Sequence, residues 1–148
     1  VCVASEDDSF SEAIRRNIVL LQFKAQNYRS FKNEFVFNMQ PAAKQRDLNY
    51  SVLSKKVGSK LYKALCSSVI YGPNASGKTN AIGAIDAMRT IVLRGNIRES
   101  NVPDLASSIL SLMPNIHSSS KDPVCFYIKF IENDFLIEYE LKLKYQST

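Results

Sequence analysis

Residues 65–80 read LCSSVIYGPNASGKTN, and the second half of this stretch decides the expected fold. Gly72 to Thr79 match the pattern G-x-x-x-x-G-K-[ST] of a phosphate-binding P-loop. The two glycines permit a backbone that turns successive N–H groups toward one anion, and a following helix directs its positive dipole end at the same point. The stretch therefore predicts a strand, a phosphate-binding loop and a helix, in that order.

The apolar patterns on the two sides of the loop indicate the same elements. Leu65–Tyr71 carries no charge and is rich in small and β-branched residues, which is typical of a strand buried on both faces of a parallel sheet. Cys66 is then a small core residue of this strand. After the loop, apolar residues recur at helical spacing and predict a helix over Lys78–Leu93, with Gly95 just beyond its end.

The motif predicts ATP and Mg²⁺ as ligands. The ammonium of Lys78 reaches the β- and γ-phosphates, the hydroxyl of Thr79 faces Mg²⁺, and the backbone N–H of Asn80 joins the phosphate cradle. Lys78 is thus the candidate catalytic cation and Thr79 the candidate metal ligand. The full set of candidate nucleotide-binding residues is Gly72, Pro73, Asn74, Ala75, Ser76, Gly77, Lys78, Thr79 and Asn80.

Hydrolysis needs a second element, an apolar strand that ends in an acidic residue and helps to hold Mg²⁺ and water. The nearest match is Phe135–Glu138, but Glu138 alternates with Glu140 and two lysines as on a solvated hairpin face. Neither a Leu-Ser-Gly-Gly signature nor a guanine-reading Asn-Lys-x-Asp pattern is present. We therefore expect this segment to bind nucleotide without efficient hydrolysis.

The rest of the chain reads mainly as antiparallel strands and loops. Alternation predicts strands over 19–26 and 34–39, and a hairpin of 126–130 and 135–143 joined by Asn133-Asp134. Its apolar face holds Phe130 and Phe135. Residues 42–60 and 96–121 are expected to be loops, the first with a turn of helix and the second with a short helix near 103–110. Residues 1–17 form a tail, and 18–148 form one domain that we expect to be part of a longer protein.

Composition excludes several classes of protein. The chain has 148 residues, of which 45% are apolar, and its longest apolar stretch is too short to span a membrane. Residues 1–17 lack the apolar core of a secretory signal. The three cysteines are widely spaced, which favours a reducing compartment without disulfides or zinc. We expect a cytoplasmic protein with no membrane partner and with His117 on its surface.

Basic residues are concentrated in one part of the chain. The net charge is +5, and residues 13–63 hold eleven bases against two acids. This imbalance indicates either a polyanionic partner, such as DNA, RNA or a nucleotide, or a solvated lysine-rich surface. Lysines 55, 56, 60 and 63 are candidates for backbone phosphate contacts. Tyr28, Phe31 and Tyr62 are either stacking platforms or core residues.

Three stretches together resemble a known group. They are LYKALCSSVIYGPNASGKTNAIGAIDAM (61–88), the turn NYRSF (27–31) and the hairpin PVCFYIKFIENDFLIEYELKLKY (123–145). The sequence resembles ABC/SMC-like bacterial AAA-type ATPases linked to abortive infection, which are related to overcoming-lysogenization nucleases and RecF proteins. The resemblance implies an α/β P-loop NTPase fold, namely the first lobe of an ABC-type ATPase head, with antiparallel strands flanking the P-loop strand and helix.

The resemblance also implies partners and one more site residue. Such heads form homodimers that sandwich ATP, and they switch an effector protein, here in anti-phage defence or DNA maintenance. Arg29 in the turn would lie near the nucleotide, unless it merely pairs with Glu34. Two other hypotheses stay open from the residues alone. One is a small P-loop kinase, although such kinases usually begin with the P-loop strand; the other is a basic nucleic-acid-binding module whose P-loop is vestigial.

Overall fold

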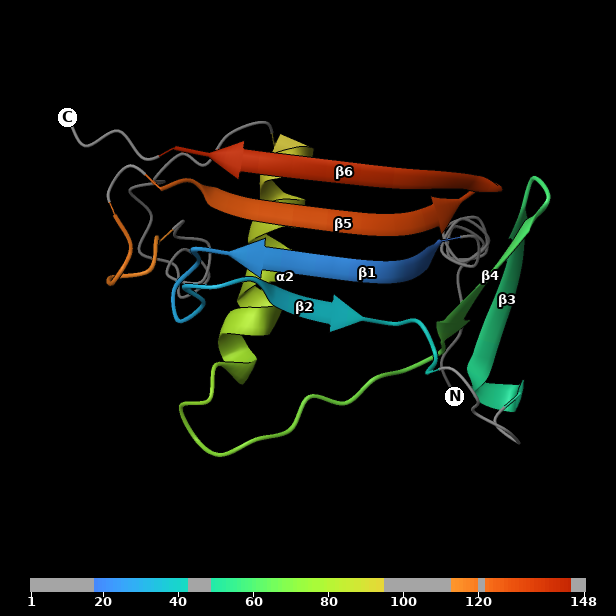
Figure 1. The fold of residues 1–148 in the computed structure, drawn as a ribbon, viewed down its shortest axis with the longest axis horizontal. Coiled ribbons are helices and arrows are strands. Elements are labelled where there is room, and N and C mark those ends of the chain that lie inside the picture. Colours follow the sequence, from blue (N-terminus) through green and yellow to red (C-terminus); the bar gives the residue numbers. More distant parts are fainter. Residues whose placement is uncertain (1–17, 43–48, 95–112, 120–121, 145–148) are drawn as a thin grey trace, which may run out of the picture. The chain divides into compact units, whose positions relative to one another are not determined.

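The computed structural model describes residues 18–42, 49–94, 113–119 and 122–144. These form a mixed α/β arrangement with two sheets (Figure 1). The strands of the larger sheet lie in the order β2-β1-β5-β6, and β3 pairs with β4 in a separate ribbon. The elements are β1 (Val19–Gln26), β2 (Phe35–Asn38), the 3-10 helix η1 (Asn49–Ser51), β3 (Val52–Val57), β4 (Lys60–Leu65), α2 (Lys78–Arg94), β5 (Val124–Glu132) and β6 (Phe135–Leu143).

The chain divides into two compact units, and several strands contribute to both. The first contains the described residues of 1–22, 38–68 and 128–139; the second contains those of 23–37, 69–127 and 140–148. In the first, Val19, Leu21, Ala64 and Ile131 form a buried cluster against which Tyr62 packs. In the second, the rings of Phe23 and Tyr28 lie 6.4 Å and 5.5 Å from that of Phe126. The β3–β4 ribbon therefore belongs to one core, and α2 to the other unit.

Alternation correctly predicts the four strands of the larger sheet, although not that β1 lies beside β5. In β1 the side chains of Val19, Leu21, Phe23 and Ala25 are buried, and β2 lies beside it as predicted. The hairpin of β5 and β6 is also confirmed. Its turn residues Asn133 and Asp134 both have positive φ, 48° and 63°, which is the pattern of a two-residue type I′ turn.

The predicted faces of this hairpin were wrong near its turn. Burial in β5 falls on Val124 and Phe126 and then shifts to Ile131, so that Phe130 is only half-buried. Phe135 is 72% exposed instead of facing inward. A prediction from strict alternation assumes that the same face of the strand is buried along its whole length. Here Ile131 joins the cluster of Val19, Leu21 and Ala64 in the first unit, whereas Phe126 packs with aromatic rings of the second.

The expected loop over 42–60 is contradicted in its second half, which contains β3. In the ribbon, Val52 lies opposite Leu65 and Val57 opposite Lys60, so Gly58 and Ser59 form a two-residue turn. Gly58 has φ +58°, as the first position of a type II′ turn requires. The lysines of β3 hid its alternation, because a ribbon with one solvated face tolerates charge on that face.

The buried strand predicted over 65–71 is also contradicted. Strand β4 ends at Leu65, whose N–H donates to Met39 O at 2.7 Å, and Cys66 is exposed rather than a core residue. Residues 67–71 have no regular structure, with Val69 and Tyr71 82% and 91% exposed. A strand buried on both faces needs a hydrogen-bonded neighbour, and the described residues supply none to this segment.

The helix after the loop is confirmed, and α2 buries one small-residue face. Ala81, Ala84, Ala87, Met88 and Ile91 are buried at helical spacing. In the part of the chain that the structure describes, no helix has the length and apolar content needed to cross a bilayer. The predicted tail over 1–17, Gly95 and the short helix near 103–110 lie outside the described residues.

Candidate functional site

The P-loop residues lie between an extended segment and the first turn of α2. The Ala81 N–H donates to Gly77 O at 3.0 Å and begins the helical hydrogen-bond series. The N–H groups of residues 78–80 precede that bond, as expected for the start of a helix. Ser76 N–H closes the loop on Pro73 O at 3.3 Å. Residues 71–81 contain no acid, so an anion at this end of α2 meets no carboxylate from the loop itself.

The conformation of the loop requires glycine at position 77, whereas at Gly72 a side chain would displace only the hydroxyl of Ser76. Gly77 has φ +91°, and a Cβ at that position would lie 3.0 Å from Ser30 Oγ and 3.4 Å from the ring of Phe31. A Cβ at Gly72 would lie 2.8 Å from Ser76 Oγ. Ala75 also has positive φ, 64°, which places a left-handed residue between them. The loop therefore has the mixed left- and right-handed backbone from which anion-binding nests are built.

The side chain of Lys78 returns over the loop that precedes it. Its Nζ donates to Gly72 O at 2.8 Å and to Pro73 O at 2.7 Å. The ammonium is thus held by main-chain oxygens at the start of the loop. Contact with a phosphate would exchange these hydrogen bonds for stronger bonds to a charged acceptor. Thr79 is exposed in the same turn of α2.

The turn at 27–31 packs directly against the loop. Tyr28 and Phe31 exchange backbone hydrogen bonds of 3.0 Å and 2.8 Å. Asn80 Nδ2 donates to Ser30 Oγ at 2.8 Å, which joins this turn to the first turn of α2. Sequence reasoning selected Arg29 from this turn, whereas the structure brings Ser30 and Phe31 to the loop.

The contacts of Arg29 differ from those expected. Its N–H donates to Met113 O at 2.8 Å, and its guanidinium carbon lies 5.5 Å from the centre of the Tyr28 ring. The alternative expectation was an ion pair between Arg29 and Glu34. The Glu34 carboxylate instead pairs with Lys24 at 3.2 Å. Proximity of Arg29 to a nucleotide stays a prediction.

Two buried asparagines, Asn27 and Asn115, fix the position of the turn. Asn27 Nδ2 donates to Asp122 O at 2.9 Å and to Pro123 O at 3.2 Å, while Asn27 Oδ1 accepts from Asn115 N–H at 3.0 Å. Asn115 Nδ2 donates to Arg29 O at 2.6 Å. The two side chains are only 3% and 7% exposed. Sequence reasoning missed Asn115, because it lies in a serine-rich loop where no pattern marks it.

Of the three aromatic candidates, Tyr28 is a core residue and Phe31 and Tyr62 are half-buried. Tyr28 is fully buried, and its Oη has no hydrogen-bond partner in the described part of the chain. Burial raises the pKa of this phenol above its ordinary value of 10.0. The Phe31 ring stacks on Phe35 at 4.5 Å, and Tyr62 packs against the core of the first unit. Tyr28 is therefore closed to base stacking, whereas Phe31 and Tyr62 are half-buried and already contact other side chains.

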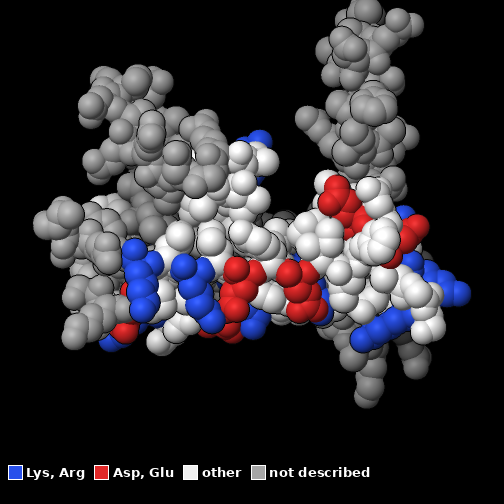
Figure 2. Space-filling model, turned by 90° about the horizontal axis from the view of Figure 1, so that it is seen from above, with Lys and Arg blue, Asp and Glu red and all other residues white. Residues whose placement is uncertain are grey.

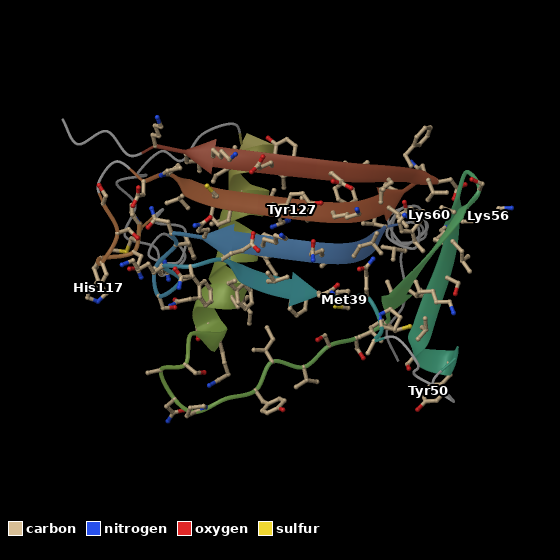
Figure 3. The ribbon with its side chains drawn as sticks, viewed as in Figure 1. Met39, Tyr50, Lys56, Lys60, His117 and Tyr127 are labelled. Carbon is tan, nitrogen blue, oxygen red and sulfur yellow. The ribbon has the colours of Figure 1, made fainter. Side chains whose placement is uncertain are left out.

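The remaining candidates lie on the surface. Glu138 Oε1 accepts from Lys129 Nζ at 2.6 Å, as expected on a solvated hairpin face. His117 is exposed, and its N–H donates to Asn115 Oδ1 (Figure 3). Within the described ranges, no group of three or more His, Cys, Asp and Glu side chains is placed to hold a metal ion. Thr79 thus stays the candidate Mg²⁺ ligand without a carboxylate beside it in its loop.

Comparisons with known proteins add no relative. No family model, no curated protein and no solved structure matches the sequence. The resemblance to ABC/SMC-like ATPases and the cytoplasmic location therefore stay predictions.

Proposed function

We propose that this chain binds ATP with Mg²⁺ through residues 72–80. The observation that carries the proposal is the loop geometry at the start of α2. Three N–H groups that precede the helical hydrogen bonds and the ammonium of Lys78 share a loop free of carboxylates. Backbone N–H groups at a helix start and a lysine are the combination that holds phosphate oxygens in P-loop proteins.

Each residue has a defined role in the proposed complex. The N–H groups of 78–80 bind and orient the phosphate oxygens, and the Lys78 ammonium balances their charge. Thr79 offers its hydroxyl to Mg²⁺, which fits a cation that keeps several waters and takes its other ligands from phosphates. When bound, Mg²⁺ supplies neutralisation of the charge on the phosphates. Ser30 and Asn80 hold the loop against the turn at 27–31.

We extend the proposal to an ABC/SMC-like ATPase head on the resemblance alone. In that setting residues outside this chain position the attacking water. Dimerisation of two heads completes the site and switches an effector. The segment by itself then binds nucleotide and turns it over poorly.

Titration calorimetry with ATP and MgCl₂ tests the binding proposal. Replacing Lys78 by Ala should weaken binding at least about tenfold, because a hydrogen bond to a charged group contributes about 1.5–3 kcal/mol. Lys144, exposed after β6, provides the control Lys144→Ala with the same loss of charge. Thr79→Val should reduce affinity only when Mg²⁺ is present. Equal affinity of the wild type and Lys78→Ala, or equal losses in Lys78→Ala and Lys144→Ala, would refute the proposal.

A further inference from the structure

The β3–β4 ribbon carries a concentration of positive charge that nucleotide binding does not use. Residues 49–66 contain four lysines and no acid. Ribbon register determines which face each lysine occupies, because residues directly opposite each other share a face and successive pairs alternate. The pairs Leu53–Ala64, Lys55–Tyr62 and Val57–Lys60 form one face, and the pairs Val52–Leu65, Ser54–Lys63 and Lys56–Leu61 form the other.

The first of these faces is the inner one. Ala64 belongs to the buried cluster of the first unit, and Val57 and Tyr62 pack against it. Lys55, on the same face, pairs with Asp134 at 3.3 Å. Ala64, Val57 and Tyr62 are therefore covered and the charge of Lys55 is compensated, whereas Leu53 and Lys60 on the same face are exposed.

The outer face of the ribbon presents lysines to solvent. Lys56 and Lys63 are exposed there, in diagonal positions around Leu61 and Ser54. Lys60 lies on the inner face beside the turn, with its Nζ 5.3 Å from the centre of the Tyr62 ring, and Lys56 and Lys60 lie at that end of the ribbon in Figure 3. Within the described residues, neither Lys56 nor Lys63 makes an ion pair.

The charge on this face differs from that on the larger sheet. Where β5 and β6 carry lysines, carboxylates accompany them, as in the pairs Lys129–Glu138 and Lys142–Glu140. Figure 2 likewise shows acidic and basic side chains next to one another on the face seen from above Figure 1. A solvated surface that serves only solubility has both signs interspersed. The outer face of β3–β4 has one sign only.

We propose that the outer face of the β3–β4 ribbon, with Lys56 and Lys63, binds the phosphodiester backbone of a nucleic acid. Lysines without an ion-pair partner bind backbone phosphates because neutralising a phosphate releases its condensed counterions. This contribution to affinity does not depend on the base sequence of the nucleic acid. A two-stranded ribbon is also slender enough to enter the major groove of a B-form duplex. A folded acidic protein would need shape complementarity that this narrow face does not offer.

Salt dependence of binding to fluorescent oligonucleotides tests the proposal on the full chain. Neutralising two phosphates gives a slope of log K against log salt of about −1.8 for a duplex and about −1.4 for a single strand. Lys56→Gln and Lys63→Gln should each reduce the magnitude of the duplex slope by about 0.9. The control Lys144→Gln, also an exposed lysine, should leave the slope unchanged.

Parallel measurements with double- and single-stranded oligonucleotides of the same length identify which form of nucleic acid the ribbon binds. Poly-glutamate serves as a competing polyanion and should displace either form only weakly. The proposal is overturned if neither oligonucleotide binds at 25 mM salt, or if the slope does not respond to Lys56→Gln and Lys63→Gln. It is also overturned if Lys144→Gln has the same effect, or if poly-glutamate competes as strongly as unlabelled oligonucleotide.

Discussion

The close approach of Gly77 to Ser30 predicts how much a methyl group added at position 77 lowers the free energy of unfolding. At φ +91° an alanine is strained, and left-handed backbone costs an L-residue about 1–2 kcal/mol. The added Cβ would also lie 3.0 Å from Ser30 Oγ and 3.4 Å from the Phe31 ring, which adds about 1–3 kcal/mol of overpacking. We expect Gly77→Ala to destabilise the second unit by about 2–5 kcal/mol.

Gly58 separates these two contributions. It has φ +58°, and a Cβ there meets nothing within 4 Å, so Gly58→Ala carries the backbone cost alone, about 1–2 kcal/mol. Ser30→Ala removes the atom nearest to the new methyl group. In a double-mutant cycle it should recover about 1 kcal/mol in the Gly77→Ala background and nothing in the Gly58→Ala background.

Urea denaturation followed by circular dichroism measures these differences. Hydrogen exchange at the Ala81 amide reports locally, because that amide donates to Gly77 O. The reasoning fails if Gly77→Ala costs no more than Gly58→Ala, or if Ser30→Ala shows no coupling with Gly77→Ala. Nucleotide affinity of the same variants then tells whether the strained loop conformation is the one that binds.

Two further predictions concern the turn that supports the loop. Tyr28→Phe removes a buried hydroxyl without a hydrogen-bond partner among the described residues, and should stabilise the protein by about 1 kcal/mol at pH 7. Because burial raises the pKa of Tyr28, the wild type should lose stability as the pH rises above about 10, where the unfolded phenol ionises first; identical profiles for Tyr28→Phe in urea titrations from pH 9 to 11 would contradict this. Asn27→Asp should cost about 3 kcal/mol, since a buried carboxylate would face the carbonyls of Asp122 and Pro123. The exposed Asn33→Asp is its control in the same titrations, and an equal effect of both would exclude the buried network as the cause.

Sequence patterns were reliable where one face of an element is buried along its whole length. The alternation of β1 and the helical spacing of α2 each match burial of that kind. Sequence-based prediction of burial failed for segments whose buried residues are set by tertiary contacts within one of the two units. Local pattern indicates a loop for the ribbon strand β3, because Lys55 interrupts the apolar face of Leu53 and Val57. Only the pairing with β4 defines that face.

The candidate site was half predictable. The glycines, Lys78 and Thr79 follow from the motif, because their spacing is fixed by local backbone geometry. Ser30 and Asn115 do not follow from it. Their roles depend on hydrogen bonds to residues 50 and 86 positions away, namely Asn80 and Arg29. No local pattern encodes such separations.

By itself, the sequence determined the loop, its helix and the strands with a continuous apolar face, since these depend on residues a few positions apart. Tertiary structure alone decided that 67–71 is exposed, that the turn at 27–31 meets the loop through Ser30, and that Lys56 and Lys63 share one exposed face. Backbone conformation and periodicity are local properties of a chain. Pairing, burial and the compensation of charge depend on partners that only folding brings together.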